Sequence, residues 1–171
     1  MATLPYQDWN PVKHTPTKMA QYVLKARMKN VWLHGPTGIQ KTRSVAYRAG
    51  KRRYVRWLDW TVFIRDVLQI NYGKINGDIH REASAKALVV IDDFARTDIN
   101  ELVINGVYGY IDQRLKYGGN TWITSQYSPK QFCNAVGKTR MTGDAVELAR
   151  AIYRRINDEY IIIGRKQLIG D

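Results

Sequence analysis

The chain has 171 residues, of which 44% are hydrophobic and 25% charged, which fits one domain with a sizeable core and excludes wholesale disorder. No apolar run approaches the roughly 20 residues that cross a bilayer, so we expect no membrane association, and the single cysteine, Cys133, permits no internal disulfide and is typical of a cytoplasmic protein. Twenty-seven Lys and Arg against 15 Asp and Glu give a net charge of +12, which favours a polyanionic partner such as nucleic acid.

The N-terminal half alternates between predicted helices and strands. Its first 16 residues contain three prolines and predict an irregular arm. Thr17 and Asp59 stand where they can cap helices. In chain order we expect a helix over 18–29, a strand over 30–34, a helix to about residue 49, a strand over 53–58 and a helix that follows Asp59.

The C-terminal half continues the alternation after a predicted loop over 72–80. The continuous apolar run 87–91 is typical of a strand that is covered on both faces. Asp144 and Glu147 form a predicted capping box. We expect, in order, a strand over 87–91, a helix over 98–117, a strand over 121–125, a short helix from Ser128, a helix over 144–157 and a strand over 160–163. This order predicts an α/β fold with a parallel sheet of about five strands flanked by helices.

A glycine-rich segment joins the first predicted strand to the next helix. Such a turn aims backbone N–H groups and a helix N-terminus at a phosphate chain. Lys41 would reach the β- and γ-phosphates of ATP, and the Thr42 hydroxyl would bind Mg²⁺. Gln40 stands where the usual pattern has glycine, so we expect slow hydrolysis; an ordinary turn followed by a chance Lys-Thr is the alternative. The predicted nucleotide-binding residues are Gly35, Pro36, Thr37, Gly38, Ile39, Gln40, Lys41 and Thr42.

Two adjacent aspartates, Asp92 and Asp93, follow the buried strand 87–91. This is the position of a Walker B motif, in which Asp92 would hold Mg²⁺ and Asp93 would orient or activate the attacking water. Capping or turn residues are the alternative interpretation. Because ligands bind at the carboxyl ends of parallel strands, we expect Lys41, Thr42 and Asp92 to converge on a magnesium-bound triphosphate.

Further candidates lie at the end of the fourth strand and on the last helix. Gln126, in Thr124-Ser125-Gln126, could hydrogen-bond the γ-phosphate or the attacking water, and a strand-end loop without a role is equally compatible. Arg150 and Arg154 share one helix face at i and i+4, and Arg155 lies nearer the core edge. These arginines are either solvated surface or an arginine finger for ATP that a neighbouring subunit holds.

The segment from Lys41 to Arg56 carries seven cations and no acidic residue. Only Lys41 is needed for a nucleotide. Several of the other cations should therefore face solvent, and nucleic acid is the expected partner.

Four aromatic residues near these motifs have two possible roles each. Tyr6 and Trp9 could pack on an adenine, and Trp57 and Trp60 could stack on bases. We expect burial against the domain for all four.

Five segments resemble the DnaC/IstB helicase-loader and transposition-helper family of AAA+ ATPases. They are Gly35–Thr42, Leu88–Asp93, Ile111–Arg114, Ile123–Gln126 and Ala151–Ile156. The resemblance runs from about Tyr6 to Arg165 and implies an AAA+ core over 17–171, with no separate lid domain. It implies ATP and Mg²⁺ bound between subunits of a ring or spiral, acting on single-stranded DNA and a replicative helicase or a transposase. It also implies a sensor role for Gln126 and a sensor or finger role for Arg155, with weaker matches at Arg150 and Arg154.

Two other interpretations stay open at this point. Segments 90–94 and 153–156 are similar to the helicase domain of small circular-DNA virus replication proteins. A nucleic-acid-binding adaptor, which keeps the fold but hydrolyses ATP poorly or not at all, is supported by Gln40 and the basic surface.

Overall fold

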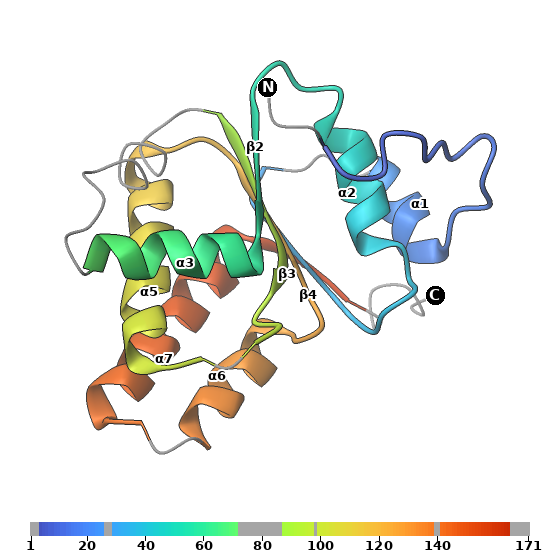
Figure 1. The fold of residues 1–171 in the computed structure, drawn as a ribbon. Helices are drawn as coiled ribbons and strands as arrows, with labels where there is room; N and C mark the ends of the chain where they lie inside the picture. Colours follow the sequence, from blue (N-terminus) through green and yellow to red (C-terminus); the bar gives the residue numbers. More distant parts are fainter. Residues whose placement is uncertain (1–3, 26–28, 72–86, 98, 139–140, 165–171) are drawn as a thin grey trace.

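A five-stranded parallel sheet forms the centre of the molecule, with helices on both faces (Figure 1). The computed structural model describes residues 4–25, 29–71, 87–97, 99–138 and 141–164. The sheet order is β2-β3-β4-β1-β5, and every neighbouring pair is parallel. The strands are β1 (Val31–His34), β2 (Val55–Asp59), β3 (Leu88–Phe94), β4 (Thr121–Ser125) and β5 (Ile161–Ile163). The predicted fold class is confirmed.

The described helices lie close to their predicted positions, and none is both long and apolar enough to cross a membrane. They are α1 (Lys18–Lys25), α2 (Lys41–Ala49), α3 (Trp60–Asn71), α5 (Glu101–Tyr117), α6 (Pro129–Gly137) and α7 (Gly143–Glu159). Thr17 caps α1, since its hydroxyl accepts from the Ala20 N–H at 3.3 Å. Asp59 caps α3 by accepting from the Thr61 N–H at 2.9 Å. The end of the first predicted helix (26–28), the predicted loop 72–80 and Asp98 lie outside the described residues.

The predicted start of the last helix is wrong. Thr142, with extended backbone at φ −64° and ψ 159°, is the N-cap, and its hydroxyl accepts from the Ala145 N–H. Asp144 lies inside the first turn instead, where a carboxylate is favourable beside the helix dipole. The predicted capping box of Asp144 and Glu147 therefore does not form, and Glu147 pairs with Arg150.

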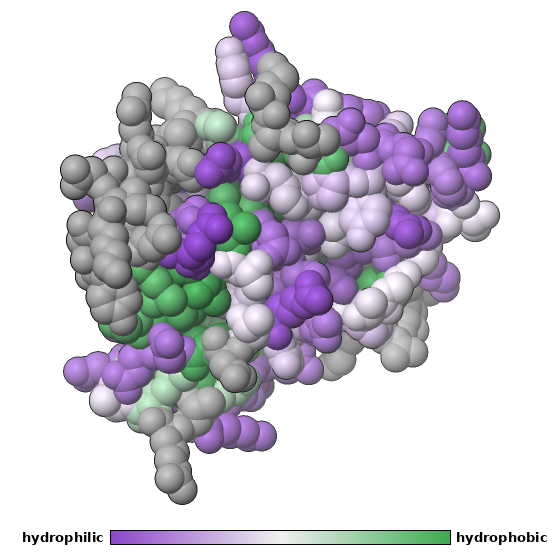
Figure 2. Space-filling view, viewed as in Figure 1, coloured by the Kyte–Doolittle hydropathy of each residue, from purple (hydrophilic) through white to green (hydrophobic). Residues whose placement is uncertain are grey.

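Each face of the sheet has its own hydrophobic cluster. Helices α3, α5, α6 and α7 cover one face and α1 and α2 cover the other (Figure 1). Trp60 is fully buried in the first cluster, and Trp57 packs partly buried against the second, so both predictions of core packing are confirmed. The outer surface over α1 and α2 is largely hydrophilic (Figure 2). Helices cover both faces of the sheet. The side chains that follow the strand ends therefore gather at its two uncovered edges, the carboxyl edge and the amino edge.

Candidate functional site

The loop between β1 and α2 borders a hollow of about 310 Å³ at the carboxyl edge of the sheet. Gly35 and Gly38 have φ values of +143° and +90°, and Gln40 has a left-handed φ of +62°. Positive φ at successive loop positions turns backbone N–H groups inward and is typical of anion-binding loops. The hollow is lined by Tyr6, Thr37, Gly38, Gln40, Lys41, Thr42, Arg43, Asp93 and Gln126.

Lys41 begins α2 and is a buried residue, with 7% of its surface exposed. Its Nζ donates to the carbonyl oxygens of Gly35 at 2.7 Å and Pro36 at 2.9 Å. Burial lowers the pKa of Lys41, and the charges of Asp93 and Asp92 oppose that shift. Two neutral loop carbonyls are weaker partners for an ammonium group than an anionic oxygen is. The contacts of Lys41 are thus ones that a phosphate can replace.

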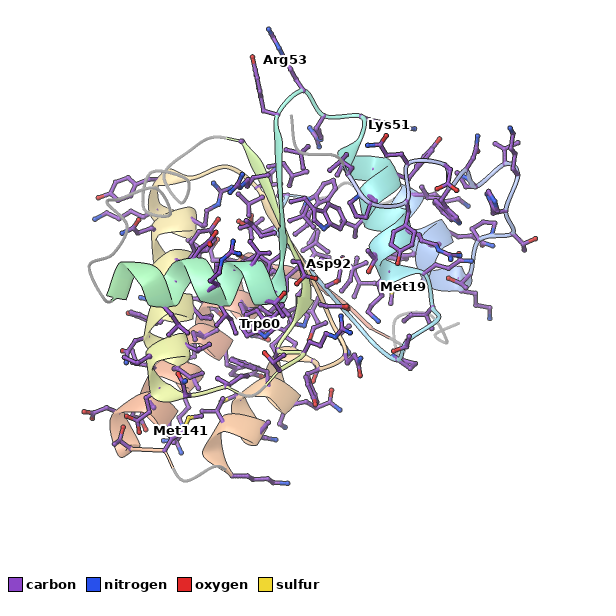
Figure 3. The ribbon with its side chains drawn as sticks, viewed as in Figure 1. Met19, Lys51, Arg53, Trp60, Asp92 and Met141 are labelled. Carbon is purple, nitrogen blue, oxygen red and sulfur yellow. The ribbon has the colours of Figure 1, made fainter. Side chains whose placement is uncertain are left out.

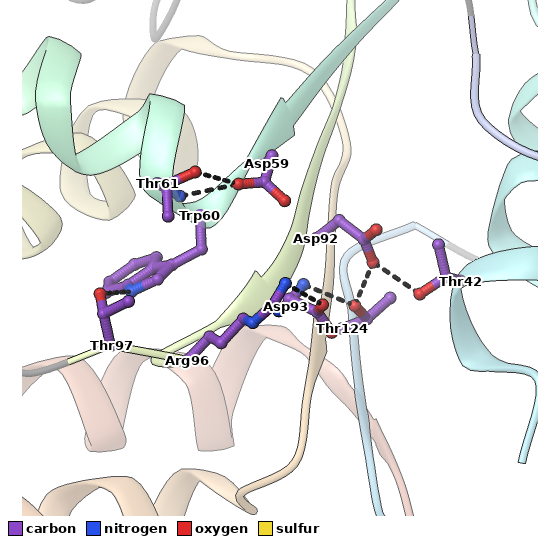
Figure 4. A network of polar contacts seen from close by, with 9 residues as sticks. All are labelled: Thr42, Asp59, Trp60, Thr61, Asp92, Asp93, Arg96, Thr97 and Thr124. Atoms are coloured by element: carbon purple, nitrogen blue, oxygen red, sulfur yellow. Dashed lines mark hydrogen bonds and ion pairs between the residues drawn. The ribbon is translucent and has the colours of Figure 1, made fainter. Parts of the chain in front are cut away.

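Asp92 projects from β3 toward α2 (Figure 3) and accepts two hydroxyl hydrogen bonds (Figure 4). The Oγ1 atoms of Thr42 and Thr124 donate to its Oδ1 at 2.9 Å and 2.5 Å. Burial raises the pKa of Asp92, while the hydrogen bonds from Thr124 and Thr42 act to lower it. A carboxylate and a threonine hydroxyl are hard oxygen ligands of the kind that Mg²⁺ prefers. The structure therefore brings Lys41, Thr42 and Asp92 together at one place.

A β-bulge in β3 places Asp93 beside the same hollow. The β3–β4 register shifts between Ile91 and Phe94, so that Asp92 and Asp93 together face Thr124. Asp93 has φ +54°, and its N–H donates to the Thr124 Oγ1 at 3.0 Å. In a regular strand the two neighbouring side chains would point to opposite faces of the sheet. The bulge lets the strand continue through both aspartates to Phe94.

The other predicted site residues lie in different places. Gln126 follows β4, is exposed and lines the hollow. Arg155 lies on α7 and packs against α5, where its Nε donates to Asp112 Oδ1 at 2.9 Å and its Nη2 to the Tyr108 hydroxyl at 2.9 Å. Arg150 pairs with Glu147 on α7, and Arg154 is exposed on the same helix. None of the three arginines is among the residues that line this hollow.

The N-terminal arm forms one wall of the hollow through Tyr6. Trp9 is only 4% exposed and packs edge-on against Tyr47, so its predicted burial is confirmed. Tyr6 is 47% exposed, and the Arg43 guanidinium lies 5.3 Å from its ring centroid. The predicted burial of Tyr6 is wrong, because its ring lies beside the Arg43 guanidinium at the border of the hollow and stays exposed.

Sequence reasoning missed His34, the last residue of β1. Burial and the charge of Lys41 both lower the pKa of His34, which favours the neutral ring at pH 7. Gly164 packs against it so closely that a Cβ atom there would lie 2.1 Å from the His34 Nε2. The available signal was its place, directly before Gly35 at the carboxyl end of a strand.

The comparisons with known proteins give structural matches only. No protein-family model and no curated protein matches the sequence. The crystal structure of the DnaC helicase loader is similar at a TM-score of 0.65 and 15% identity, over 95% of this chain and 99% of that chain. DnaI is similar at a TM-score of 0.58 and 18% identity, over 85% of this chain and 80% of that chain.

A replication initiator also shares the fold. DnaA from Aquifex aeolicus, bound to AMPPCP, is similar at a TM-score of 0.57 and 16% identity, over 86% of this chain but only 44% of that chain. The protein described here thus spans less than half the length of that DnaA chain. The resemblance to helicase loaders is confirmed at the level of the fold, which this chain shares with the DnaC helicase loader and DnaI.

Proposed function

We propose that this protein is a replication-associated AAA+ ATPase that binds ATP and Mg²⁺ in the hollow beside Lys41. The observation that carries the proposal is the hydrogen bond of 2.9 Å between Thr42 and Asp92, with the Lys41 ammonium at the same hollow. Helicase loaders and an AMPPCP-bound initiator share the fold and support the replication context.

Each residue of the hollow has a role that follows from its contacts. Lys41 donates to β- and γ-phosphate oxygens in place of the carbonyls of Gly35 and Pro36. Thr42 and Asp92 hold Mg²⁺, which neutralises phosphate charge. Asp93 orients the attacking water from the bulge. Backbone N–H groups of the segment 35–42 hold the phosphate chain.

Residues at the rim of the hollow complete the site. Gln126 contacts the γ-phosphate or the water from the end of β4. Tyr6 and Arg43, which lie together on one wall, form the surface for the remainder of the nucleotide. Gln40 makes hydrolysis slow, because a side chain stands where P-loops have glycine.

The proposal extends to assembly and partners. Arg155, and less strongly Arg150 and Arg154, act on ATP that a neighbouring subunit holds in a ring or spiral. The present contacts of Arg155 with Asp112 and Tyr108 are exchanged on assembly. The assembly works in the cytoplasm on single-stranded DNA and on a replicative helicase; a transposase is the alternative partner.

Lys41→Ala tests the nucleotide site. The variant removes charge-assisted hydrogen bonds that contribute about 1.5–3 kcal/mol, so ATP should bind about 10- to 100-fold more weakly. A titration with a fluorescent ATP analogue in Mg²⁺ measures this loss. Lys51→Ala is the matched control, because Lys51 is an exposed cation that does not line the hollow. Equal affinity in wild-type protein and Lys41→Ala contradicts the proposal.

Phosphate release measured on the same wild-type samples separates an ATPase from an adaptor. We expect slow turnover. Tight binding without any turnover, with or without single-stranded DNA, would instead identify a nucleic-acid-binding adaptor that retains the nucleotide site.

A further inference from the structure

The connection from α2 to β2 carries three exposed cations in succession. We call residues 50–54 the basic loop; its Lys51, Arg52, Arg53 and Tyr54 are all exposed, as the sequence predicted for several of these cations. Figure 3 places Lys51 and Arg53 at one end of the molecule, far from Asp92. A hydrophilic projection stands there in Figure 2. The basic loop thus lies at the amino edge of the sheet, one helix length away from the phosphate-binding loop.

Two grooves flank the basic loop, and Arg52 borders both. The first has a volume of about 390 Å³ and is lined by Arg52, Arg53, Tyr54, Ala87, Leu88, Gly119 and Asn120. The second has a volume of about 530 Å³ and is lined by Pro11, Leu24, Tyr47, Arg48, Lys51 and Arg52. Among the described residues, neither lining includes an acidic one. Both grooves are therefore positively charged at their walls.

Each groove also carries a tyrosine that is paired with a cation. The Lys51 Nζ lies 4.5 Å from the ring centroid of Tyr47, and the Arg53 Cζ lies 5.1 Å from that of Tyr54. Tyr54 is 61% exposed, which leaves ring surface open to a flat partner. Cationic grooves that alternate with aromatic rings are typical of single-strand binding, since unpaired bases stack on the rings while cations contact phosphates.

Two residues that line the first groove are held in place by hydrogen bonds from a buried arginine. The buried Arg114 guanidinium donates from Nη2 to the carbonyl oxygens of Ala87 at 2.8 Å and Asn120 at 2.9 Å. Both residues line the groove. The groove is thus held by a hydrogen-bonded framework that joins the amino ends of β3 and β4.

We propose that these two grooves bind single-stranded DNA, with Lys51, Arg52 and Arg53 on its phosphates and Tyr54 stacked on a base. The proposal rests on the replication role proposed above for its choice of DNA, and it names where that DNA lies. An anionic membrane would use the cations but has no flat ring for Tyr54, whereas single-stranded DNA supplies a flat base beside every phosphate. Binding at this surface does not need nucleotide in the hollow at the opposite edge.

Fluorescence anisotropy with a labelled oligothymidylate tests the proposal in the full chain. The double variant Arg52→Ala/Arg53→Ala should weaken binding by about tenfold or more and reduce the salt dependence. Tyr54→Ala should weaken it by about tenfold with an unchanged salt dependence, because stacking releases no counterions. Lys130→Ala/Lys138→Ala removes two exposed cations from α6 and is the matched control, with unchanged binding expected.

The outcomes separate this proposal from the nucleotide site. If Arg52→Ala/Arg53→Ala and Tyr54→Ala keep the wild-type affinity for DNA, the grooves are not the DNA-binding site. This conclusion holds even if Lys41→Ala shows that ATP binds as proposed. Loss of DNA binding in these variants supports the grooves as the DNA-binding site, whatever the result of the ATP titration. Tighter binding to duplex DNA, RNA of the same length or anionic phospholipid vesicles than to the oligothymidylate also overturns the assignment.

Discussion

The two edges of the sheet both bury a charged side chain, and they use it differently. At the carboxyl edge Lys41 is 7% exposed, with Asp92 close enough to influence its pKa. At the amino edge Arg114 is 2% exposed and donates to the Thr121 hydroxyl as well as to two backbone carbonyls. Burial lowers the pKa of both groups. A buried charge with a shifted pKa is thus common to both edges.

The difference lies in what surrounds each charge. Lys41 borders an open hollow together with Asp93 and Thr42, so charges of opposite sign face a volume that a ligand can enter. The guanidinium of Arg114 donates its hydrogen bonds to acceptors at the ends of neighbouring strands. The exposed charged groups of the nearby basic loop are all positive. The proposed ligand of the carboxyl edge, ATP with Mg²⁺, carries charges of both signs, as that edge does. The amino edge combines a rigid support with the surface proposed above for single-stranded DNA.

The largest predicted effect tests whether Arg114 is a support. Arg114→Leu removes the guanidinium donor to the carbonyls of Ala87 and Asn120 and to the Thr121 hydroxyl, which should cost about 3–5 kcal/mol of unfolding free energy and lower the Tm by about 10 °C. ATP affinity should stay unchanged at temperatures where the variant is folded. Thermal unfolding and an ATP titration measure the two quantities.

Arg65→Leu is the control for this variant, because the Arg65 side chain is 63% exposed and pairs only at the surface with Asp66. Its Tm should change little. If Arg114→Leu lost ATP binding while folded, the two edges would be coupled and the contrast between them would fail.

An effect of intermediate size is expected from Tyr160, buried beside the amino edge where β5 begins. Burial raises the pKa of Tyr160 from 10.0 to about 12. The neutral phenol is favoured in the folded state, so the stabilisation from this shift is complete below pH 10 and is lost as the pH rises toward 12. Between pH 9 and pH 11 wild-type protein should lose about 1 kcal/mol of stability relative to Tyr160→Phe.

Urea unfolding at the two pH values measures this loss. Tyr22→Phe changes an exposed tyrosine and is the matched control. A constant stability difference between wild-type protein and Tyr160→Phe across this range would show that Tyr160 meets water in the folded state.

The sequence predicts the order of elements and the main site because both are local patterns. Three patterns can each be recognised from a few consecutive residues: the apolar run 87–91, the segment 35–42 and the pair Asp92-Asp93. The carboxyl-edge rule then brings Thr42 and Asp92 together although they are 50 residues apart. The strands concerned, β1 and β3, are separated by β4 in the sheet, so the inference needs only that parallel strands share one carboxyl edge and no knowledge of side-chain packing.

The remaining features depend on contacts between distant residues. The bulge at Asp93 is fixed by Thr124, 31 residues away. Arg155 is held by Asp112 and Tyr108 on α5, which no helical periodicity of α7 reveals. The left-handed Tyr6 likewise has no local signature. Such pairings follow from tertiary packing, and only the structure supplies them.

The smallest predicted effect concerns Gln40, where the carboxyl edge departs from the glycine of the usual loop. Its backbone is left-handed at φ +62°, and its side chain accepts from the Thr17 N–H at 3.0 Å and donates to the Thr15 carbonyl at 3.3 Å. These bonds to the arm offset the cost of a non-glycine residue at positive φ. Gln40→Ala loses the bonds and keeps the cost, whereas Gln40→Gly loses both.

We therefore expect Gln40→Gly to be more stable than Gln40→Ala by about 1 kcal/mol and close to wild-type protein. Urea unfolding of the three proteins measures this order. In a regular helix the alanine variant would be the more stable one; that result would mean that position 40 does not adopt the left-handed conformation in solution. The expected order would instead show that contacts with the arm let glutamine replace glycine, so that the loop at the carboxyl edge is held from outside the sheet while Arg114 holds the amino edge from within.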